Sequence, residues 1–517
     1  MRQFLRKITT GQIVLAGCLL TLLYALLSQG TYHSDEHFQI LEYARMKLFG
    51  TPGPENLAWE YPAMMRPGLQ PFIAYCAGAM LDAADLYSPF VHVFLLQLLS
   101  GAFSVAVLIF FLGAVRRELG TLSWRKWYLI LGLFLWFMAY LHVHFSAEMF
   151  SGNALLLLAG LFLRYRRDDC DRKEFLRGVA LGLAAGLAFI VKFQTGFALA
   201  GFGLWLLFFH RRWRLYAGIA AGFIVMLGVG ALADHWLYGE WVCTPVNYLR
   251  ENILNGEMDK FGREPWWYYL TAPILEGGIV FGLLAAVATL YFFVRHPRHV
   301  VTWMLVPFLF VHFFLGHKEL RFFFPVLFFS PWFIVLMIRN LPRRIVDSRP
   351  WRYTVALLAV LNFCAMAYPL TIDTPDIYFF KMMRKYCDGK ERVTVLIPYG
   401  ERTYYSIFQN IGTPRMTIAT FYMPDNMRWE CPPPGEPLEK RARELSGEGT
   451  QVIVLSADPG LDGSSSLPLR KITWSPYPRW VIRYFNFNDW TRFTVRSKNI
   501  YELVPARTSA PDNGSAR

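Results

Sequence analysis

The sequence has few cysteines and no motif that pairs them. Its seven cysteines stand far apart, none forms a CxxC pair, and several lie inside long apolar runs. A disulfide framework or a structural zinc site needs clustered thiols. The sequence therefore indicates neither of them, and we expect no metal site.

Motifs of a nucleotide site, a repeat architecture or a cleaved leader are also missing. No glycine-rich phosphate loop follows a predicted strand, and no internal repeat is evident. The basic start MRQFLRK precedes an apolar run without an evident small-x-small cleavage site. We therefore expect an uncleaved first helix and not a signal peptide.

Charged residues are scarce, and most of them are basic. They make up 17% of the chain, whereas 54% of the residues are hydrophobic. The formal net charge of +14 comes from basic residues in short loops between apolar runs. A nucleic-acid-binding protein would gather this charge on one soluble face, so the pattern is a signal of membrane topology instead.

What the chain does have is a series of apolar runs long enough to cross a bilayer. They predict an α-helical polytopic membrane protein of about eleven transmembrane helices. We expect these helices near residues 8–29, 89–115, 127–145, 149–164, 175–191, 196–210, 215–236, 272–294, 299–316, 322–339 and 351–370.

A further apolar run, LQPFIAYCAGAML at residues 69–81, is too short for a span and contains Pro71 and Gly78. We interpret it as an interfacial or re-entrant helix. Nearly every basic cluster then falls on the cytoplasmic side, as the positive-inside rule requires, whereas a crossing helix would move all of them outside. Four segments are thereby predicted on the non-cytoplasmic side: residues 30–88, 238–271, 316–321 and those after about 371.

The last part of the chain has a different pattern. Residues 1–370 form the predicted transmembrane domain, 371–505 a small α/β domain and 506–517 a solvated tail. The predicted strands are RVTVLIP, MTIATFYM and TQVIVLSA, with RWVIRYFNF and NIYELVP as further candidates, and residues 402–411 and 436–446 have helical character.

Acidic residues directly after the first predicted span are the first candidate site. His33, Asp35 and Glu36 stand where the chain leaves the bilayer. A carboxylate in a partly desolvated cleft there can take a proton from a bound hydroxyl as a general base. The alternative is that Asp35 and Glu36 only cap helix ends.

Basic residues at two other membrane boundaries form the second candidate site. His317, Lys318 and Arg321 cluster within about one helical turn in GHKELRFFFP, where they can hold a phosphate at headgroup depth, with Glu319 to orient one of them. The alternative is a set of snorkelling anchors. Lys192 lies between two spans, as an anchor or as a contact for a lipid phosphate.

The loop at residues 234–270 is rich in Trp, Tyr and Asn and has several charged residues. Proteins bind sugars with aromatic faces together with amide and carboxylate groups. For Trp266, Trp267, Tyr268 and Tyr269 an aromatic interfacial belt is the competing interpretation. A carboxylate, a phosphate-binding cluster and an aromatic-polar loop on one side of the membrane together describe glycosyl transfer from a polyprenyl-phosphate sugar.

Three stretches carry a resemblance to a known family. HSDEHFQILEYARMKLFG with AWEY and RP, then YGEWVCTPVNYLRENI, then HKELRFFFPV resemble the loop motifs of the membrane mannosyltransferases of glycosyltransferase family 22, in the same order. The chain departs from those motifs at Ala58, Tyr61 and Pro67 and at Lys192-Phe193, which is compatible with a bacterial relative.

The resemblance implies the GT-C fold, dolichyl- or polyprenyl-phosphate mannose as donor, a lipid-linked glycan as acceptor and inversion at the anomeric carbon. It implies no cofactor, and it places the enzyme in the bacterial inner membrane or the endoplasmic reticulum membrane, with a periplasmic or lumenal active site. Asp35 is implied as the catalytic carboxylate, with Glu36 as second candidate. The predicted substrate-binding residues are His33, Gln39, Glu60, Arg66, Tyr238, Asn247 and Trp266.

Two alternatives stay open on the residues. One is a GT-C transferase that uses another polyprenyl-phosphate sugar, such as an arabinose or a glucose. The other is a lipid-linked glycan transporter, which would need polar residues at mid-membrane. Here the charges stand at helix ends on one face, which favours the enzyme.

Overall fold

The computed structural model divides the chain into two compact units, Met1–Ile372 and Asp373–Arg517. It describes residues 7–28, 30–31, 33–51, 53–54, 57–166, 173–371, 375–398, 420–432, 435–456, 458, 460–473 and 499–504. The predicted helix at 402–411, the candidate strand RWVIRYFNF and the predicted tail lie outside these residues.

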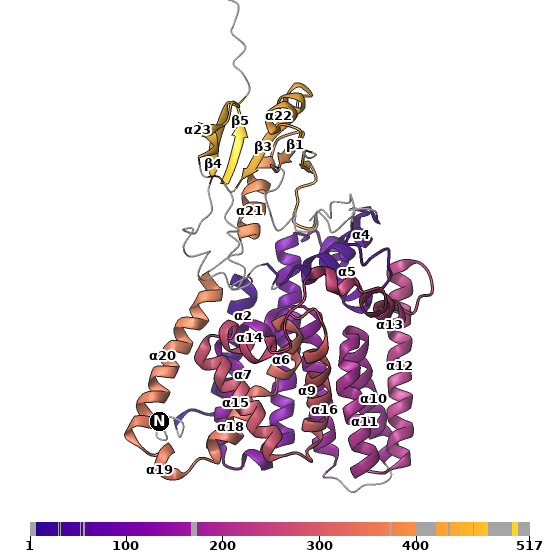
Figure 1. The fold of residues 1–517 in the computed structure, drawn as a ribbon, viewed down its shortest axis with the longest axis vertical. Helices are drawn as coiled ribbons and strands as arrows, with labels where there is room; N and C mark the ends of the chain where they lie inside the picture. Colours follow the sequence, from indigo (N-terminus) through magenta and orange to yellow (C-terminus); the bar gives the residue numbers. More distant parts are fainter. Residues whose placement is uncertain are drawn as a thin grey trace, which may run out of the picture. The chain divides into compact units, whose positions relative to one another are not determined.

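The first unit is a helix bundle. Figure 1 shows its long helices side by side, with the short helices α4, α5 and α13 gathered at one end of the bundle. The longer helices are α2 (Thr10–Leu27), α6 (Pro89–Leu119), α7 (Leu122–Phe134), α9 (Ala147–Tyr165), α10 (Glu174–Val191), α11 (Gly196–Phe209), α12 (Trp213–Tyr238), α15 (Ile279–Arg295), α16 (Val300–Phe314), α18 (Ser330–Arg339) and α20 (Arg349–Thr371).

Short elements connect the long helices. They are α3 (Ser34–Glu36), η1 (His37–Leu41), α4 (Glu42–Phe49), α5 (Leu69–Ala83), α8 (Trp136–Val143), η4 (Phe193–Thr195), α13 (Thr244–Leu249), η5 (Arg250–Leu254), η6 (Glu257–Phe261), α14 (Tyr268–Glu276), η7 (Leu320–Phe323), α17 (Phe324–Leu327) and α19 (Arg343–Val346).

Six helices among the described residues are long and apolar enough to cross a membrane, or up to eight if each of two bent pairs is one span. Three shorter apolar helices accompany them, at Phe193–Phe209, Ile279–Arg295 and Val300–Phe314. A multi-pass helical membrane protein is therefore what the structure describes, while the predicted number of about eleven spans stays a prediction. Helix α5 is in neither group, and its interfacial character stays a prediction.

Three predicted spans are interrupted in the structure. The run at 322–339 bends by 60° between Leu320–Leu327 and Ser330–Arg339. The run at 127–145 bends by 60° between α7 and α8, where Leu135 is extended. Asn362 of α20 accepts from Trp136 N at 2.9 Å and donates to Phe134 O at 2.7 Å, so the backbone groups freed by the bend stay paired. The run at 272–294 is divided into α14 and α15 at Gly278, whose φ of 71° is left-handed.

Helices α10 and α12 pack with their backbones in close approach. A Cβ at Gly182 would lie 2.1 Å from Ile219 O, and one at Gly222 would lie 2.2 Å from Val179 O. Small residues spaced four apart on both helices thus permit this approach, as is common between membrane helices. The close pair holds the end of α10, and with it Lys192, in a defined place.

The second unit contains a five-stranded mixed sheet in the order β2-β1-β3-β5-β4. Strand β1 pairs in parallel with β2 and β3, and β5 pairs antiparallel with β3 and β4. The strands are β1 (Val393–Leu396), β2 (Met427–Glu430), β3 (Gln451–Ser456), β4 (Leu469–Thr473) and β5 (Asn499–Leu503), with helices α21 (Pro375–Cys387), α22 (Leu438–Gly447) and α23 (Leu461–Ser464).

Strands β1, β3 and β5 coincide with apolar runs that predict strands, and α22 with the predicted helical stretch. The run MTIATFYM does not form a strand in its described part, residues 420–423, which turn instead. Strands β2 and β4 carry charged residues and were not predicted, because the apolar pattern is weak where a strand is only half buried.

Candidate active site

Asp35 lies in the short helix α3, directly after the first bundle helix. The His33 side chain caps this helix, its Nδ1 accepting from Asp35 N at 3.2 Å. The Asp35 carboxylate is 24% exposed, and its Oδ2 accepts from Nη1 of Arg321 at 2.7 Å. Its Oδ1 lies 3.4 Å from His33 Nδ1. A carboxylate that keeps an open side is thus held by a cation from far along the chain.

Arg321 joins three acidic residues and is itself almost completely buried. Its Nη1 donates to Asp35 and, at 3.2 Å, to Oε1 of Glu148, while its Nε donates to Glu319. The same oxygen of Glu148 accepts from Lys192 Nζ at 2.8 Å. Two predicted phosphate-binding cations, from the loop after α10 and from η7, therefore meet on one carboxylate.

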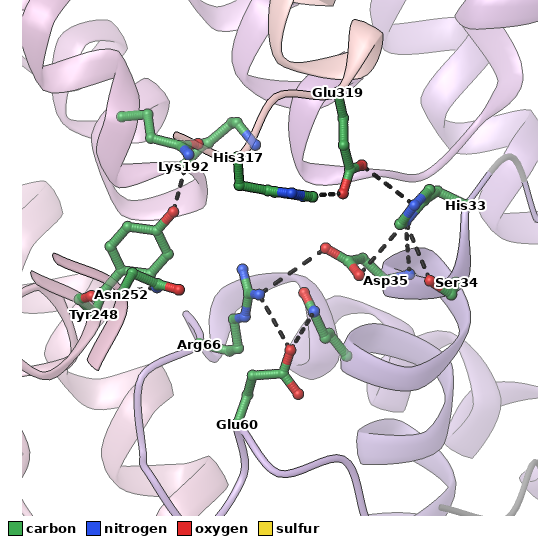
Figure 2. A network of polar contacts seen from close by, with 12 residues as sticks. His33, Ser34, Asp35, Glu60, Arg66, Lys192, Tyr248, Asn252, His317 and Glu319 are labelled. Atoms are coloured by element: carbon green, nitrogen blue, oxygen red, sulfur yellow. Dashed lines mark hydrogen bonds and ion pairs between the residues drawn. The ribbon is translucent and has the colours of Figure 1, made fainter. Parts of the chain in front are cut away.

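Glu319 links the two histidines of the motifs. Its Oε1 lies 2.8 Å from His317 Nε2 and its Oε2 lies 3.3 Å from His33 Nε2. His317 Nδ1 in turn lies 3.1 Å from the carbonyl oxygen of Gly262. Figure 2 shows the side chains of Asp35, Arg66, His317 and Glu319 turned toward a common centre.

Arg66 approaches the centre from the opposite side. Its Nη2 lies 3.3 Å from Oε1 of Glu60 and 4.0 Å from Asp35 Oδ2, and Gln39 also donates to Glu60 Oε1, at 3.2 Å (Figure 2). The guanidinium of Arg66 lies over the Tyr248 ring, with the Cζ atom 5.7 Å from the ring centroid. Oε2 of Glu60 and Nε of Arg66 are buried without a hydrogen-bond partner among the described residues, so polar capacity is left here for a ligand.

Charges around the cluster set the ionisation of its carboxyls. Burial acts to raise the pKa of Asp35, but the charge of Arg321 and the hydrogen bond and charge of His33 outweigh it, so this pKa lies well below its usual value. The pKa of Glu319 is lowered in the same way against the effect of burial, first by Arg321. The pKa of Glu60 is raised by burial, and the nearby charge of Arg66 offsets only part of this rise.

Several predicted site residues lie outside this cluster. Glu36 is buried, with its Oε1 accepting from Phe145 N at 2.9 Å and its Oε2 3.1 Å from His144 Nδ1, so it ties α3 to the start of α9. Lys318 donates to the carbonyl oxygens of Glu264 and Leu315. Trp266 is 62% exposed and lies edge-on against Trp267.

Two predicted residues support the cluster through the backbone. The Tyr238 hydroxyl accepts from Arg66 N at 3.2 Å and donates to Arg66 O at 2.8 Å, and Asn247 donates to Met64 O at 3.1 Å. These bonds hold the loop that presents Arg66. Their side chains are occupied in this way, and neither residue contacts the central carboxylates in the described structure.

Glu148 and Tyr248 are the cluster residues that the sequence patterns missed. Glu148 follows Ser146, which caps α9 by accepting from Met149 N, and stands at the edge of an apolar run where it resembles an ordinary helix-end charge. The signal that could have found it is Lys192, a cation with no acidic neighbour in sequence. Tyr248 gives no such signal, because it is one of many tyrosines in its loop.

Among the described residues, no group of three or more His, Cys, Asp or Glu side chains could hold a metal ion. The acidic residues of the cluster have arginine, lysine and histidine as partners instead. The chemistry that this arrangement supports is proton transfer and the binding of an anion.

Comparison with known proteins finds a family and relatives by sequence. The model of the Alg9-like mannosyltransferase family matches residues 12–385. The mannosyltransferase APTG1 of Arabidopsis thaliana is 27% identical over 59% of this chain and 54% of its own length, so the match spans about half of that relative. GPI alpha-1,2-mannosyltransferase 3 of Mus musculus is 23% identical over 76% of this chain and 71% of its own.

Solved structures show the fold. ArnT from Cupriavidus metallidurans, in its crystal structure bound to undecaprenyl phosphate, superposes with a TM-score of 0.57 at 13% sequence identity. The similarity covers 96% of this chain and 99% of that one. At this identity it shows that the two chains share a fold, the GT-C type that the motifs imply.

Proposed function

The chain belongs to the Alg9-like mannosyltransferase family, and we propose that it transfers a mannosyl residue from dolichyl- or polyprenyl-phosphate mannose to a lipid-linked glycan. The observation that carries the proposal is the position of Arg321, which joins the candidate base Asp35 to a second cation, Lys192, through Glu148. A base and an anion receptor in direct contact suit a sugar phosphate as donor.

The proposed reaction is a single displacement. An acceptor hydroxyl attacks the anomeric carbon of the donor as Asp35 takes its proton, and the bond between this carbon and the phosphate oxygen breaks. The electron pair of that bond leaves with the polyprenyl phosphate, and the configuration at the anomeric carbon inverts. The products are the elongated glycan, the lipid phosphate and a proton on Asp35.

The cations stabilise the leaving group. Negative charge grows on the departing phosphate in the transition state, and fixed donors aimed at it lower the barrier more than they stabilise the bound donor. Arg321 provides a planar fork and Lys192 a point charge. Both are buried at the site, where such contacts act more strongly than in water.

Glu60, Arg66 and Gln39 are proposed to hold the acceptor. Glu60 and Arg66 each have a buried polar atom without a partner among the described residues, and Arg66 lies beside Asp35. A carboxylate and a guanidinium are suited to sugar hydroxyls. We place the site on the non-cytoplasmic side, which corresponds to the periplasm or the lumen of the endoplasmic reticulum.

The test is transfer by purified protein in lipid. Wild type should move labelled mannose from polyprenyl-phosphate mannose to a lipid-linked mannoside, and Asp35→Asn should not. If only the glucose or arabinose donor is used, the enzyme is a transferase of another sugar. If labelled lipid-linked glycan crosses the bilayer of a vesicle and no bond forms with any donor, the protein is a transporter.

A further inference from the structure

A buried carboxylate joins the two cations of the site. Glu148 is 4% exposed, and its Oε1 accepts from Lys192 Nζ at 2.8 Å and from Arg321 Nη1 at 3.2 Å. Lys192 and Arg321 are themselves 8% and 7% exposed. Both nitrogen atoms touch one oxygen, so they lie no farther apart than the sum of these two distances.

Two buried cations this close repel each other and have lost most of their hydration. A carboxylate between them offsets both effects and holds them at a separation that a single phosphate group can bridge. Nη2 of Arg321 and two of the three ammonium protons of Lys192 have no hydrogen-bond partner among the residues that the structure describes. These donors remain for a ligand while Glu148 uses the others.

The surrounding structure keeps Glu148 in place. It stands in the first turn of α9, whose start is capped by Ser146, and α9 packs against α6 and α10 in the bundle. The charged groups of Lys192 and Arg321 stand at the ends of long, flexible side chains, which are attached to the loop after α10 and to η7. The carboxylate is therefore the fixed group, and the cations are the groups that it places.

We propose that Glu148 is a positioning residue that holds Lys192 and Arg321 together as one receptor for the phosphate of the donor lipid. This inference rests on the proposed function for the identity of the lipid. Glu148 itself does not contact the donor. The competing interpretation is that Glu148 only stabilises the fold as the partner of two buried cations.

Glu148→Gln separates positioning from anion binding. Glutamine keeps the size of the side chain and an oxygen that accepts from Lys192, but it removes the negative charge. The electrostatic cost of a bound phosphate falls, so KM for the donor should not rise, whereas kcat should fall at least tenfold because a neutral amide holds the two cations less firmly. Lys192→Met should behave differently, raising KM for the donor several-fold.

A double-mutant cycle tests whether Glu148 acts through Lys192. Once Lys192 is Met, Glu148→Gln should cost kcat much less than it does in the wild type, so the two effects do not multiply. The matched control is Glu174→Gln, which breaks an ion pair with Arg212 near the other end of α10. The effects of Glu174→Gln and Lys192→Met on kcat should multiply.

Binding of polyprenyl phosphate gives a readout that needs no transfer. Measured in detergent by tryptophan fluorescence, affinity should fall in Lys192→Met and should not fall in Glu148→Gln. If the wild type binds this lipid with that pattern but transfers no mannose, the sugar assignment fails while the phosphate site at Lys192 stands, and kcat for the donor that is used then tests the positioning role.

Three results would overturn the inference. One is a kcat of Glu148→Gln within about twofold of wild type per folded molecule. Another is a fully multiplicative cycle with Lys192→Met. The third is a loss of lipid affinity in Glu148→Gln as large as in Lys192→Met, because Glu148 would then support binding and not position.

Discussion

Asp35 and Glu36 are neighbours in the chain, but their carboxylates lie in different surroundings. Asp35 meets Arg321 and keeps an open side, whereas Glu36 is buried against His144 and the Phe145 backbone. The contacts of Asp35 suit the candidate chemistry, whereas those of Glu36 tie α3 to the segment just before α9. The two residues can therefore be distinguished by experiment.

Asp35→Asn should lower kcat on the order of 100-fold or more in a protein that still folds, because it removes the base but keeps the size of the side chain and its hydrogen bonding. Glu36→Gln should chiefly lower the melting temperature, because a buried charged hydrogen bond is lost. Transfer assays and thermal unfolding of both variants check this. Near-normal turnover of Asp35→Asn would remove Asp35 as the base.

Arg321→Lys should impair the enzyme although it keeps the charge. A lysine cannot reach Asp35, Glu148 and Glu319 at once as the guanidinium fork does. We expect Arg321→Ala to cost about 2–4 kcal/mol of transition-state stabilisation, and Arg321→Lys to lose a large part of it. The kinetic control is Arg263→Lys, since Arg263 is 70% exposed and pairs with Asp259. Equal rates for wild type and Arg321→Lys would leave Arg321 as a structural partner of buried carboxylates, with no role in the reaction.

Acid should destabilise the wild type more than Asp35→Asn. Since the folded pKa of Asp35 lies well below its usual value, ionised Asp35 stabilises the fold above a pH of about 4. This stability is lost as the pH falls through the folded pKa. The asparagine of the variant does not titrate, so melting temperatures recorded from pH 7 to pH 3 should fall less in Asp35→Asn. Parallel curves for the two proteins would contradict the ion pair with Arg321.

At the scale of elements, the pair α10 and α12 determines where Lys192 stands. Lys192 directly follows α10, and α10 lies against α12 with backbone atoms in near contact at Gly178, Gly182, Gly218 and Gly222. No side chain fits in that seam. The position of a candidate phosphate ligand therefore depends on glycines one or more turns away from it.

Gly182→Ala should separate the two helices. Its Cβ would lie 2.1 Å from Ile219 O, so the backbones must move apart, at a cost of about 1–3 kcal/mol. Gly228 on α12 is the matched control, because a Cβ there meets nothing within 4 Å. Thermal unfolding should show a lower melting temperature for Gly182→Ala and no such decrease for Gly228→Ala. A Gly182→Ala protein as stable as wild type would mean that the seam is looser than described.

At the scale of the whole molecule, topology decides on which side the chemistry occurs. The positive-inside argument places the loop between α12 and α14 outside and the loop between α11 and α12 inside. Loop residues Cys243 and Arg211 report on these two sides, and Cys243 is exposed. The site cluster contains His317, which contacts Gly262 in the first of these loops.

In a background that keeps only Cys243, an impermeant maleimide should label intact cells or sealed vesicles of native orientation. A protein whose single cysteine is introduced by Arg211→Cys should be labelled after permeabilisation alone. The number of membrane spans that precede each loop determines on which side of the membrane that loop lies, and hence whether the maleimide reaches it from outside. Labelling of Arg211→Cys from outside would overturn the predicted arrangement of spans.

Local patterns in the sequence were enough to identify the membrane class, the family and the loops that contain the candidate site. Long apolar runs, basic loops and three ordered motifs are local patterns, and each is readable without knowing what lies beside it. The same patterns indicated Asp35, Arg321, Lys192, Arg66 and Glu60, which the structure brings together.

Which charges meet depends on how distant segments of the chain pack together. Lys192, Glu148 and Arg321 lie on three separate segments, so their contacts depend on how α9, α10 and η7 pack, which no local pattern encodes. The tertiary structure also separated Glu36 and Lys318 from the cluster, although both stand in the motifs. The break at Leu135 was hidden because Asn362, which pairs with the backbone groups on both sides of it, lies far away in the sequence on α20. The break at Gly278, a glycine in the left-handed conformation, was hidden because the hydropathy of its run is continuous across it.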